Sequence, residues 1–116
     1  MKRGDVVIVD FPYSDQTGSK VRPALVVQAD SLNARLDDTI LALITSSRRR
    51  MVGSNTQLLI DISTAGGKLT GLRMNSVLLC ENLVTREQSL IRATLGRFPP
   101  PMMQQVDACL MAALGL

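Results

Sequence analysis

The sequence predicts a mainly β domain with helices (the α+β class), folded as a small, partly closed antiparallel β-barrel of the SH3-like kind that ends in a helix. Five or six short apolar segments alternate with polar or glycine-containing stretches, which is the pattern of strands joined by loops. Only the last segment of the chain has its apolar residues at helical spacing. A chain of 116 residues corresponds to one domain, residues 1–116.

The first two strands are expected on either side of a polar loop. Asp5 to Phe11 is almost wholly apolar, and Ala24 to Val27 resumes the apolar run. Ser14 to Lys20 has the composition of a loop and is too long for a two-residue turn. Because a residue before proline is steered toward extended backbone, Arg22 is expected in strand geometry beside Pro23 at the start of the second strand.

The remaining elements follow from local patterns. Asp30 or Ser31 is expected to cap a helical turn or two, and Ser63 to Gly71, which holds three glycines, is expected to be a loop. Further strands are predicted over Thr39 to Thr45, Gln57 to Ile62, Ser76 to Thr85 and Ser89 to Gly96. After Pro99 to Pro101, an amphipathic helix is predicted from Met102 to the C-terminus.

The amino-acid composition limits the kinds of catalysis and binding that the chain can perform. There is no histidine, so acid–base chemistry has to come from other side chains, and no cofactor or metal site is indicated. The net charge of +3 is compatible with a polyanionic partner. Cys80 and Cys109 lack CxxC spacing and are expected to be buried and reduced. With no signal peptide and no membrane-spanning run, we expect a cytoplasmic protein.

Apolar residues are abundant for a chain of this size. Several strands are apolar on both faces, and the last helix carries Met102, Met103 and Met111. One core could absorb these side chains. The alternative, toward which the pattern leans, is an apolar interface in a two-fold homodimer.

Three motifs resemble a known family. They are GDVVIVDFPYSDQTGSKVRPALVV at 4–27, ALITSS at 42–47 and SVLLCENLVTR at 76–86. Together they resemble the MazF/PemK (Kid) family of toxins from type II toxin–antitoxin modules, over essentially the whole chain. The resemblance implies a homodimeric CcdB/MazF/PemK-like barrel that cleaves single-stranded RNA without a metal. The reaction is attack by the ribose 2′-hydroxyl, which gives a 2′,3′-cyclic phosphate and a 5′-hydroxyl.

The resemblance assigns catalysis to Arg22 and Thr45. A guanidinium can meet two oxygens of the phosphorane transition state, and a neighbouring hydroxyl can donate to the same oxygens. By the two-residue period of strands, this pairing requires Arg22 and Thr45 to share one face of the sheet. One branch of the family has an acid–base pair of arginine and aspartate on the strand Val77 to Glu81. Here Leu79 replaces that arginine, so Glu81 is either a supporting base or an ion-pair partner of Arg22.

The resemblance also suggests an RNA-binding surface and a protein partner. The residues expected to contact RNA are Lys20, Ser46, Ser47, Arg48, Arg73 and Arg86. Arg48 opens the run Arg48 to Arg50, which is either a solvated turn or a guide for the RNA backbone. The groove is expected to bind a cognate antitoxin through an acidic, apolar tail, and operator DNA only together with that antitoxin.

Other functions remain compatible with the sequence. A toxin of the same fold that binds a topoisomerase would have no ribonuclease activity. A degenerate toxin would retain only antitoxin binding and operator co-repression. A plain SH3-like binding module is disfavoured, because such grooves are aromatic-lined and this chain has one Tyr, two Phe and no Trp.

Overall fold

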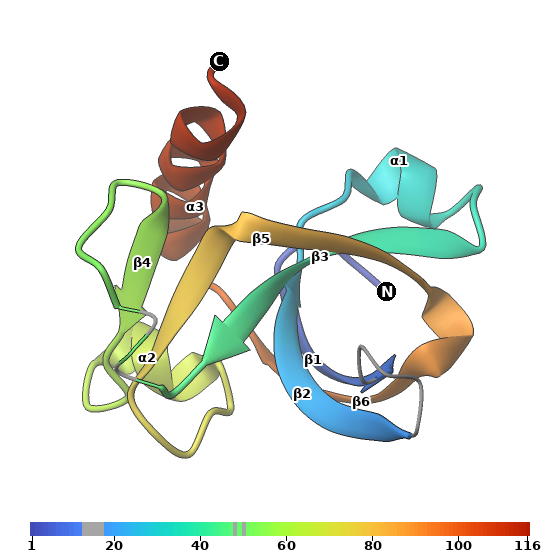
Figure 1. Ribbon diagram of the computed structural model, residues 1–116, viewed down its shortest axis with the longest axis horizontal. Coiled ribbons are helices and arrows are strands. Elements are labelled where there is room, and N and C mark those ends of the chain that lie inside the picture. The colour runs from blue at the N-terminus through green and yellow to red at the C-terminus, as the bar shows by residue number, and fades with distance from the viewer. Residues whose placement is uncertain (13–17, 48, 50) are drawn as a thin grey trace.

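The computed structural model describes residues 1–12, 18–47, 49 and 51–116, whose strands form one antiparallel sheet in the order β4-β5-β3-β2-β1-β6 (Figure 1). The strands are β1 (Asp5–Pro12), β2 (Ser19–Val26), β3 (Asp38–Thr45), β4 (Gln57–Ile60), β5 (Ser76–Glu87) and β6 (Ile91–Arg97). The sheet is strongly curled, and its edge strands β4 and β6 do not pair with each other. The predicted mainly β class is confirmed, and the sheet formed by the described strands curls without closing.

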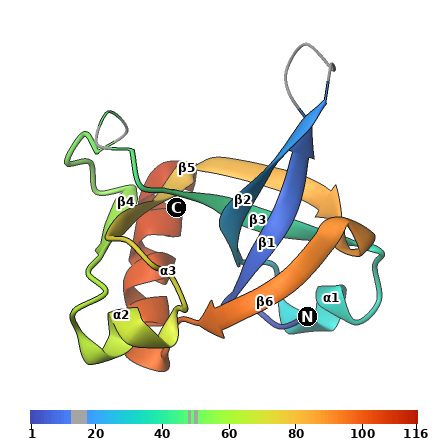
Figure 2. The same cartoon turned by 90° about the horizontal axis from the view of Figure 1, so that it is seen from below.

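The helices lie around this sheet. They are α1 (Asp30–Asn33), α2 (Ala65–Leu69), the short 3₁₀ helix η2 (Gln88–Leu90) and α3 (Pro100–Leu114). The last helix begins at Pro100, where proline costs no hydrogen bond, and ends at Gly115 in left-handed geometry, with φ of 72°. Figure 2 shows α1 and α3 at opposite ends of the sheet. None of the described helices is long and apolar enough to cross a membrane.

One predicted loop is a helix. Ser63 to Gly71 contains α2, whose first turn is capped by the Thr64 hydroxyl, which accepts a 2.9 Å hydrogen bond from the Gly67 N–H. The glycines there serve packing: a Cβ at Gly67 would overlap the carbonyl oxygen of Asp61. The loop prediction was wrong because glycine occurs where two backbone segments pack closely as well as in turns.

The core occupies both sides of the central strands. One cluster lies between the sheet and α3 and includes Leu25, Ile44, Leu78 and Val106. A second cluster fills the inside of the curl, around Val7, Val9, Ala24, Val26 and Leu41. This explains why β1, β2 and β3 read as nearly continuous apolar runs. Cys80 and Cys109 are buried in the first cluster and are free thiols.

Two irregularities in the pairing shape the surface. β2 pairs with β1 over seven positions, Val6 to Pro12, but with β3 only over Ala24 to Val26. The first half of β2 therefore has no β3 partner. In β5, the pairing with β3 jumps from Leu83 to Leu79, so that the intervening residues form a bulge. Figure 1 shows β5 bending sharply along its length.

Candidate active site

Register places Arg22 and Thr45 on one face. Ala24 pairs with Leu43 and Val26 with Leu41, so these four side chains point the same way. Arg22 lies two residues before Ala24, and Thr45 lies two residues after Leu43, at the same end of the two strands. The predicted register is confirmed.

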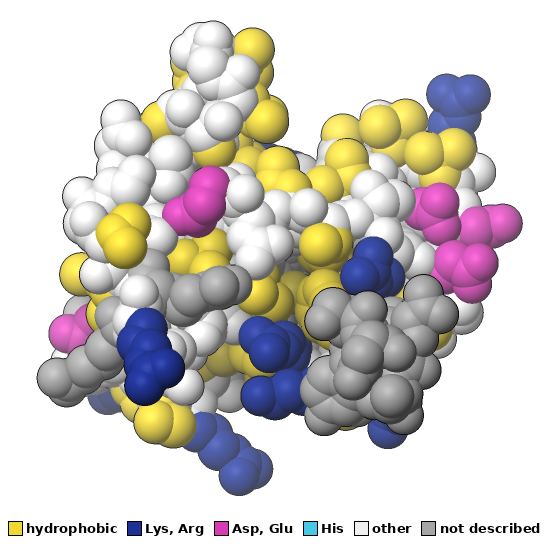
Figure 3. Space-filling model, in the orientation of Figure 1, with side chains coloured by type: hydrophobic (Ala, Val, Ile, Leu, Met, Phe, Trp, Pro, Cys, Tyr) yellow, Lys and Arg dark blue, Asp and Glu magenta, His cyan; other side chains and the backbone are white. Residues whose placement is uncertain are grey.

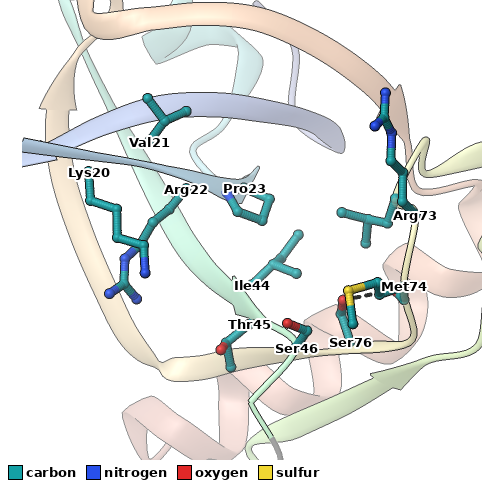
Figure 4. Close-up of a pocket in the computed structure, with 11 residues that line it drawn as sticks. Lys20, Val21, Arg22, Pro23, Ile44, Thr45, Ser46, Arg73, Met74 and Ser76 are labelled. Atoms are coloured by element: carbon teal, nitrogen blue, oxygen red, sulfur yellow. Dashed lines mark hydrogen bonds between the residues drawn. The ribbon is translucent and has the colours of Figure 1, made fainter.

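Both side chains line a cavity of about 300 Å³ in the gap where β2 and β3 are unpaired. Its walls are Lys20, Val21, Arg22, Pro23, Ile44, Thr45, Ser46, Leu72, Arg73, Met74 and Ser76. Figure 4 shows Lys20 and Arg22 reaching from β2 in the same direction, with Thr45 and Ser46 at the end of β3. Five residues predicted for catalysis or RNA binding therefore meet in one cavity.

The charges around this cavity are positive. Lys20, Arg22 and Arg73 line it, and its described walls hold no carboxylate. The ion pairs found among the described residues, Arg3–Asp107 and Arg92–Asp10, use other cations. Figure 3 shows Lys and Arg side chains gathered on the lower part of this face. Fixed cations around an open cavity suit a phosphate group.

The Thr45 hydroxyl is oriented by its own chain. It accepts a 3.1 Å hydrogen bond from the Ser47 N–H. Because that bond uses a lone pair of the hydroxyl oxygen, the hydroxyl proton stays free to donate into the cavity. Ser47 itself is exposed and does not line the cavity, so its contribution is through the backbone.

Six lining residues were not predicted as site residues: Val21, Pro23, Ile44, Leu72, Met74 and Ser76. Ser76 is buried, and its hydroxyl donates to the Met74 carbonyl at 2.9 Å. In the sequence it marks only the start of a strand. Nothing local indicates that the segment before β5 folds against the mouth of β2, so these neighbours could not be found from the motif alone.

Glu81 lies elsewhere. It stands in the β5 bulge and lines a separate hollow of about 330 Å³ with Arg49, Val52, Gln57, Leu79 and Asn82. Its Oε1 accepts hydrogen bonds from the Thr56 hydroxyl at 3.2 Å and from Gln57 Nε2 at 2.7 Å. Glu81 forms no ion pair with Arg22, so that interpretation was wrong. The carboxylate instead anchors the segment that leads into β4.

One predicted RNA contact, Arg86, does not line the cavity, and another, Arg48, cannot be placed relative to it. The Arg86 guanidinium stacks on the Phe11 ring, 5.2 Å from its centroid, and Arg86 does not line the cavity. Arg48 lies outside the described residues, as do residues 14–17 of the predicted loop. Ser19 and Lys20, which end that loop in the prediction, belong to β2.

A larger, more apolar cavity of about 1160 Å³ adjoins the first and shares Ser46, Met74 and Ser76 with it. Its remaining walls are Met51, Leu59, Ile60, Asp61, Ile62, Ser63 and Asn75. Leu59 and Met74 are 69% and 62% exposed, which is unusual for large apolar side chains. This wall is a candidate interface.

A family model described as "PemK-like, MazF-like toxin of type II toxin-antitoxin system" matches residues 2–114. The chain belongs to this family. It is 31% identical over 117 residues to a protein named endoribonuclease EndoA from Bacillus subtilis (strain 168), covering 100% of this chain and 96% of that protein. The PemK/MazF resemblance drawn from the three sequence motifs is thereby confirmed.

Solved structures agree with the PemK/MazF fold. A mycobacterial endoribonuclease in complex with its cognate antitoxin has a TM-score of 0.80 at 22% identity, covering 100% of this chain and 96% of that one. A MazE–MazF complex from Deinococcus radiodurans has a TM-score of 0.76 at 21% identity, with coverages of 100% and 97%. At these identities the likeness supports the fold, and the residues of the site have to be argued from this chain.

Proposed function

We propose that this PemK/MazF-family chain is the toxin of a type II toxin–antitoxin module and a sequence-selective, metal-independent endoribonuclease. The observation that carries the proposal is the meeting of Arg22 and Thr45 in one cation-lined cavity. The family match and the endoribonuclease relative support the same activity.

The cavity suits cleavage by the neighbouring ribose. The 2′-hydroxyl gives its proton to solvent water as its oxygen attacks phosphorus, the bond from phosphorus to the 5′-oxygen breaks, and the leaving 5′-oxygen takes a proton from water, so that the products carry a 2′,3′-cyclic phosphate and a 5′-hydroxyl. Arg22 stabilises the charge that gathers on the non-bridging oxygens, because a guanidinium offers parallel donors. The Thr45 hydroxyl donates a hydrogen bond to the same non-bridging oxygens. Lys20 and Arg73 hold the flanking phosphates, and they make binding sensitive to salt.

The remaining predicted residues take supporting roles. Ser46 lines both cavities and is placed to contact the RNA, whereas Ser47 orients Thr45 through its N–H. Arg48 remains a proposed guide for the RNA backbone. Glu81 contributes by anchoring Thr56 and Gln57 rather than by taking a proton.

The same surfaces suit the proposed partners. The cation-lined cavity matches the acidic part of an antitoxin tail, and its own apolar wall, which includes Val21, Pro23 and Leu72, matches the apolar part. Two solved relatives are complexes with an antitoxin. We place the homodimer interface at the exposed apolar side chains around β4, and binding to operator DNA in the complex with antitoxin only. We propose a cytoplasmic location, because an enzyme that cleaves single-stranded RNA has to meet that substrate in the cytoplasm.

The first experiment is cleavage of a long single-stranded RNA in excess EDTA, with end mapping. Wild type should give cyclic phosphate and 5′-hydroxyl ends, and Arg22→Ala should be slower by about 100-fold or more. Arg97→Ala, at an exposed arginine that lines neither cavity, is the matched control. Thr45→Ser should keep most of the activity that Thr45→Val loses, because only serine retains the hydroxyl.

Two results would contradict this mechanism. Intact RNA with the folded wild-type protein would favour a non-catalytic toxin that binds a topoisomerase, or a degenerate toxin that acts only with its antitoxin. Cleavage that persists in Arg22→Ala would place the chemistry outside this cavity.

A further inference from the structure

The position of the Arg86 side chain costs desolvation free energy, and no hydrogen bond of the described residues offsets this cost at the Nε. Its guanidinium lies over the Phe11 ring, and one terminal nitrogen donates to the Thr85 carbonyl at the surface, at 2.9 Å. Its Nε is buried without a hydrogen-bond partner, one of two such side-chain atoms among the described residues. No carboxylate of a described residue forms an ion pair with it. A desolvated, unpaired donor needs an explanation.

The ring beneath Arg86 is firmly held. Phe11 packs against two buried clusters, one inside the curl of the sheet and one formed by Leu43, Val77 and Leu79. It therefore fills the mouth of the curl. The Arg86 guanidinium carbon lies over this ring, within cation–π distance of it.

This stack lies beside the cavity that holds Arg22. Phe11 pairs with Lys20, and Val9 pairs with Arg22, so Phe11 and Arg22 are diagonal neighbours on one face. Diagonal neighbours in an antiparallel pair stand about 7–8 Å apart. A phosphate held by Arg22 therefore has its adjoining nucleoside within reach of the stack.

We propose that Arg86, whose guanidinium lies over Phe11, is a stacking platform for a nucleobase next to the scissile phosphate. The face of the guanidinium that points away from Phe11 receives the base. Guanidinium planes and aromatic rings are the surfaces on which single-stranded nucleic acids stack their bases. The inference rests on the proposed function, since it names how that same site holds its substrate.

The alternative is that Arg86 only covers Phe11. A lysine or methionine would cover the ring equally well with its aliphatic chain, and neither would bury an Nε. A plane with a delocalised charge is what distinguishes arginine from both. Substitution can therefore separate the two roles.

The test compares two probes that carry equal numbers of phosphates. One is a short oligodeoxyadenylate, and the other is an abasic deoxyribose-phosphate strand of the same length. Wild type should bind the base-bearing strand more tightly, and Arg86→Lys should reduce this preference by roughly five-fold or more. Because lysine keeps the charge, the slope of log affinity against log salt should stay unchanged. Arg92→Lys, at an arginine already paired with Asp10, should behave like wild type.

Three outcomes would overturn the proposal. Arg86→Lys could keep the full preference for bases, it could weaken both probes equally, or Arg92→Lys could lose as much as Arg86→Lys. Thermal unfolding shows whether each variant is folded. Arg86→Met, which keeps the cover on Phe11, is the second variant if lysine is not tolerated, and it should also lose the preference.

The binding assay does not depend on cleavage, because neither probe has a 2′-hydroxyl. If wild type prefers the base-bearing strand through Arg86 but leaves RNA intact, the stacking platform is supported and the proposed ribonuclease activity is contradicted. If wild type cleaves RNA but shows no preference for the base-bearing strand, the ribonuclease activity is supported and the stacking platform is contradicted.

Discussion

Pro23 shows how a single residue opens the site. It has no N–H to donate, and it is the last residue of β2 before pairing with β3 begins at Ala24. The neighbouring strands separate at this position, and Arg22 and Lys20 project into the gap. The rule for residues before proline predicted the extended geometry of Arg22 from the sequence. It could not show that the gap holds a cavity.

At the same scale, Glu81 gives a direct test of its assignment. Glu81→Gln should change the cleavage rate by less than about ten-fold, whereas loss of a general base costs roughly a hundred-fold or more. The reason is that the Gln amide oxygen still accepts from Thr56 and Gln57. Single-turnover rates measure the effect, with Thr45→Val as the positive control. A hundred-fold loss in Glu81→Gln with unchanged thermal stability would restore a catalytic role.

Among the elements, β6 and α2 approach each other unusually closely. A Cβ at Gly96 would overlap the Leu69 carbonyl oxygen and lie 2.6 Å from the Thr70 carbonyl carbon. Both contacts are backbone atoms, which cannot rotate away as a side chain would. This close approach fixes the end of β6 before the chain enters α3.

Gly96→Ala should therefore destabilise the protein by about 3 kcal/mol, through overpacking. Gly53→Ala is the matched control: Gly53 has φ of 68° but nothing within 4 Å of an added Cβ, so its cost of about 1 kcal/mol is conformational only. Urea unfolding followed by circular dichroism compares the two. Equal losses would contradict the close contact.

The raised pKa of the buried Cys80 thiol makes the stability of the folded protein depend on pH. Burial raises the pKa of this thiol to about 12 from an ordinary 9.0, and neighbouring Cys109 and Glu81 act in the same direction. The folded state therefore keeps a proton that the unfolded chain releases above its ordinary pKa. The resulting stability is present below pH 9.0 and is lost as the pH rises toward 12.

We expect the unfolding free energy of wild type to fall more steeply between pH 9.0 and about pH 12 than that of Cys80→Ala, since the variant lacks the titrating group. Urea midpoints under reducing conditions measure both. The comparison cancels the lysine and tyrosine titrations that the two proteins share. Parallel curves would mean that Cys80 is not desolvated as described.

Local patterns predicted most elements, because the strands are short, apolar and bounded by turn residues. The strand predicted over Gln57 to Ile62 is β4, Gln57–Ile60, and the predicted helix start at Met102 is Pro100. The β5 bulge was not predictable, since it depends on the register with β3. The same holds for Leu72 to Ser76, which reaches the cavity only through the path of the whole chain.

At the scale of the molecule, an apolar surface is left uncovered around the edge strand β4. Val52, Leu59 and Met74 are 70%, 69% and 62% exposed, and the last two line the larger cavity. An unpaired edge beside exposed apolar side chains is a surface that natural proteins cover. A second copy of the chain is the cover proposed above.

Leu59→Lys should weaken the dimer by about 30-fold or more, because a charge would replace a central apolar contact. Leu114→Lys changes an exposed leucine at the end of α3, 58% exposed, and should leave the dimer intact. Sedimentation equilibrium of both variants measures the effect. A wild-type monomer at micromolar concentration, or dissociation by Leu114→Lys alone, would contradict this interface.

The gap between β2 and β3 has a consequence for control. Each strand is anchored on its other side, β2 by β1 and β3 by β5, so Arg22 and Thr45 hold their positions with no ligand present. No binding free energy is needed to order them. We therefore expect a ligand that covers the gap to block the site by occupying it and not by preventing its assembly.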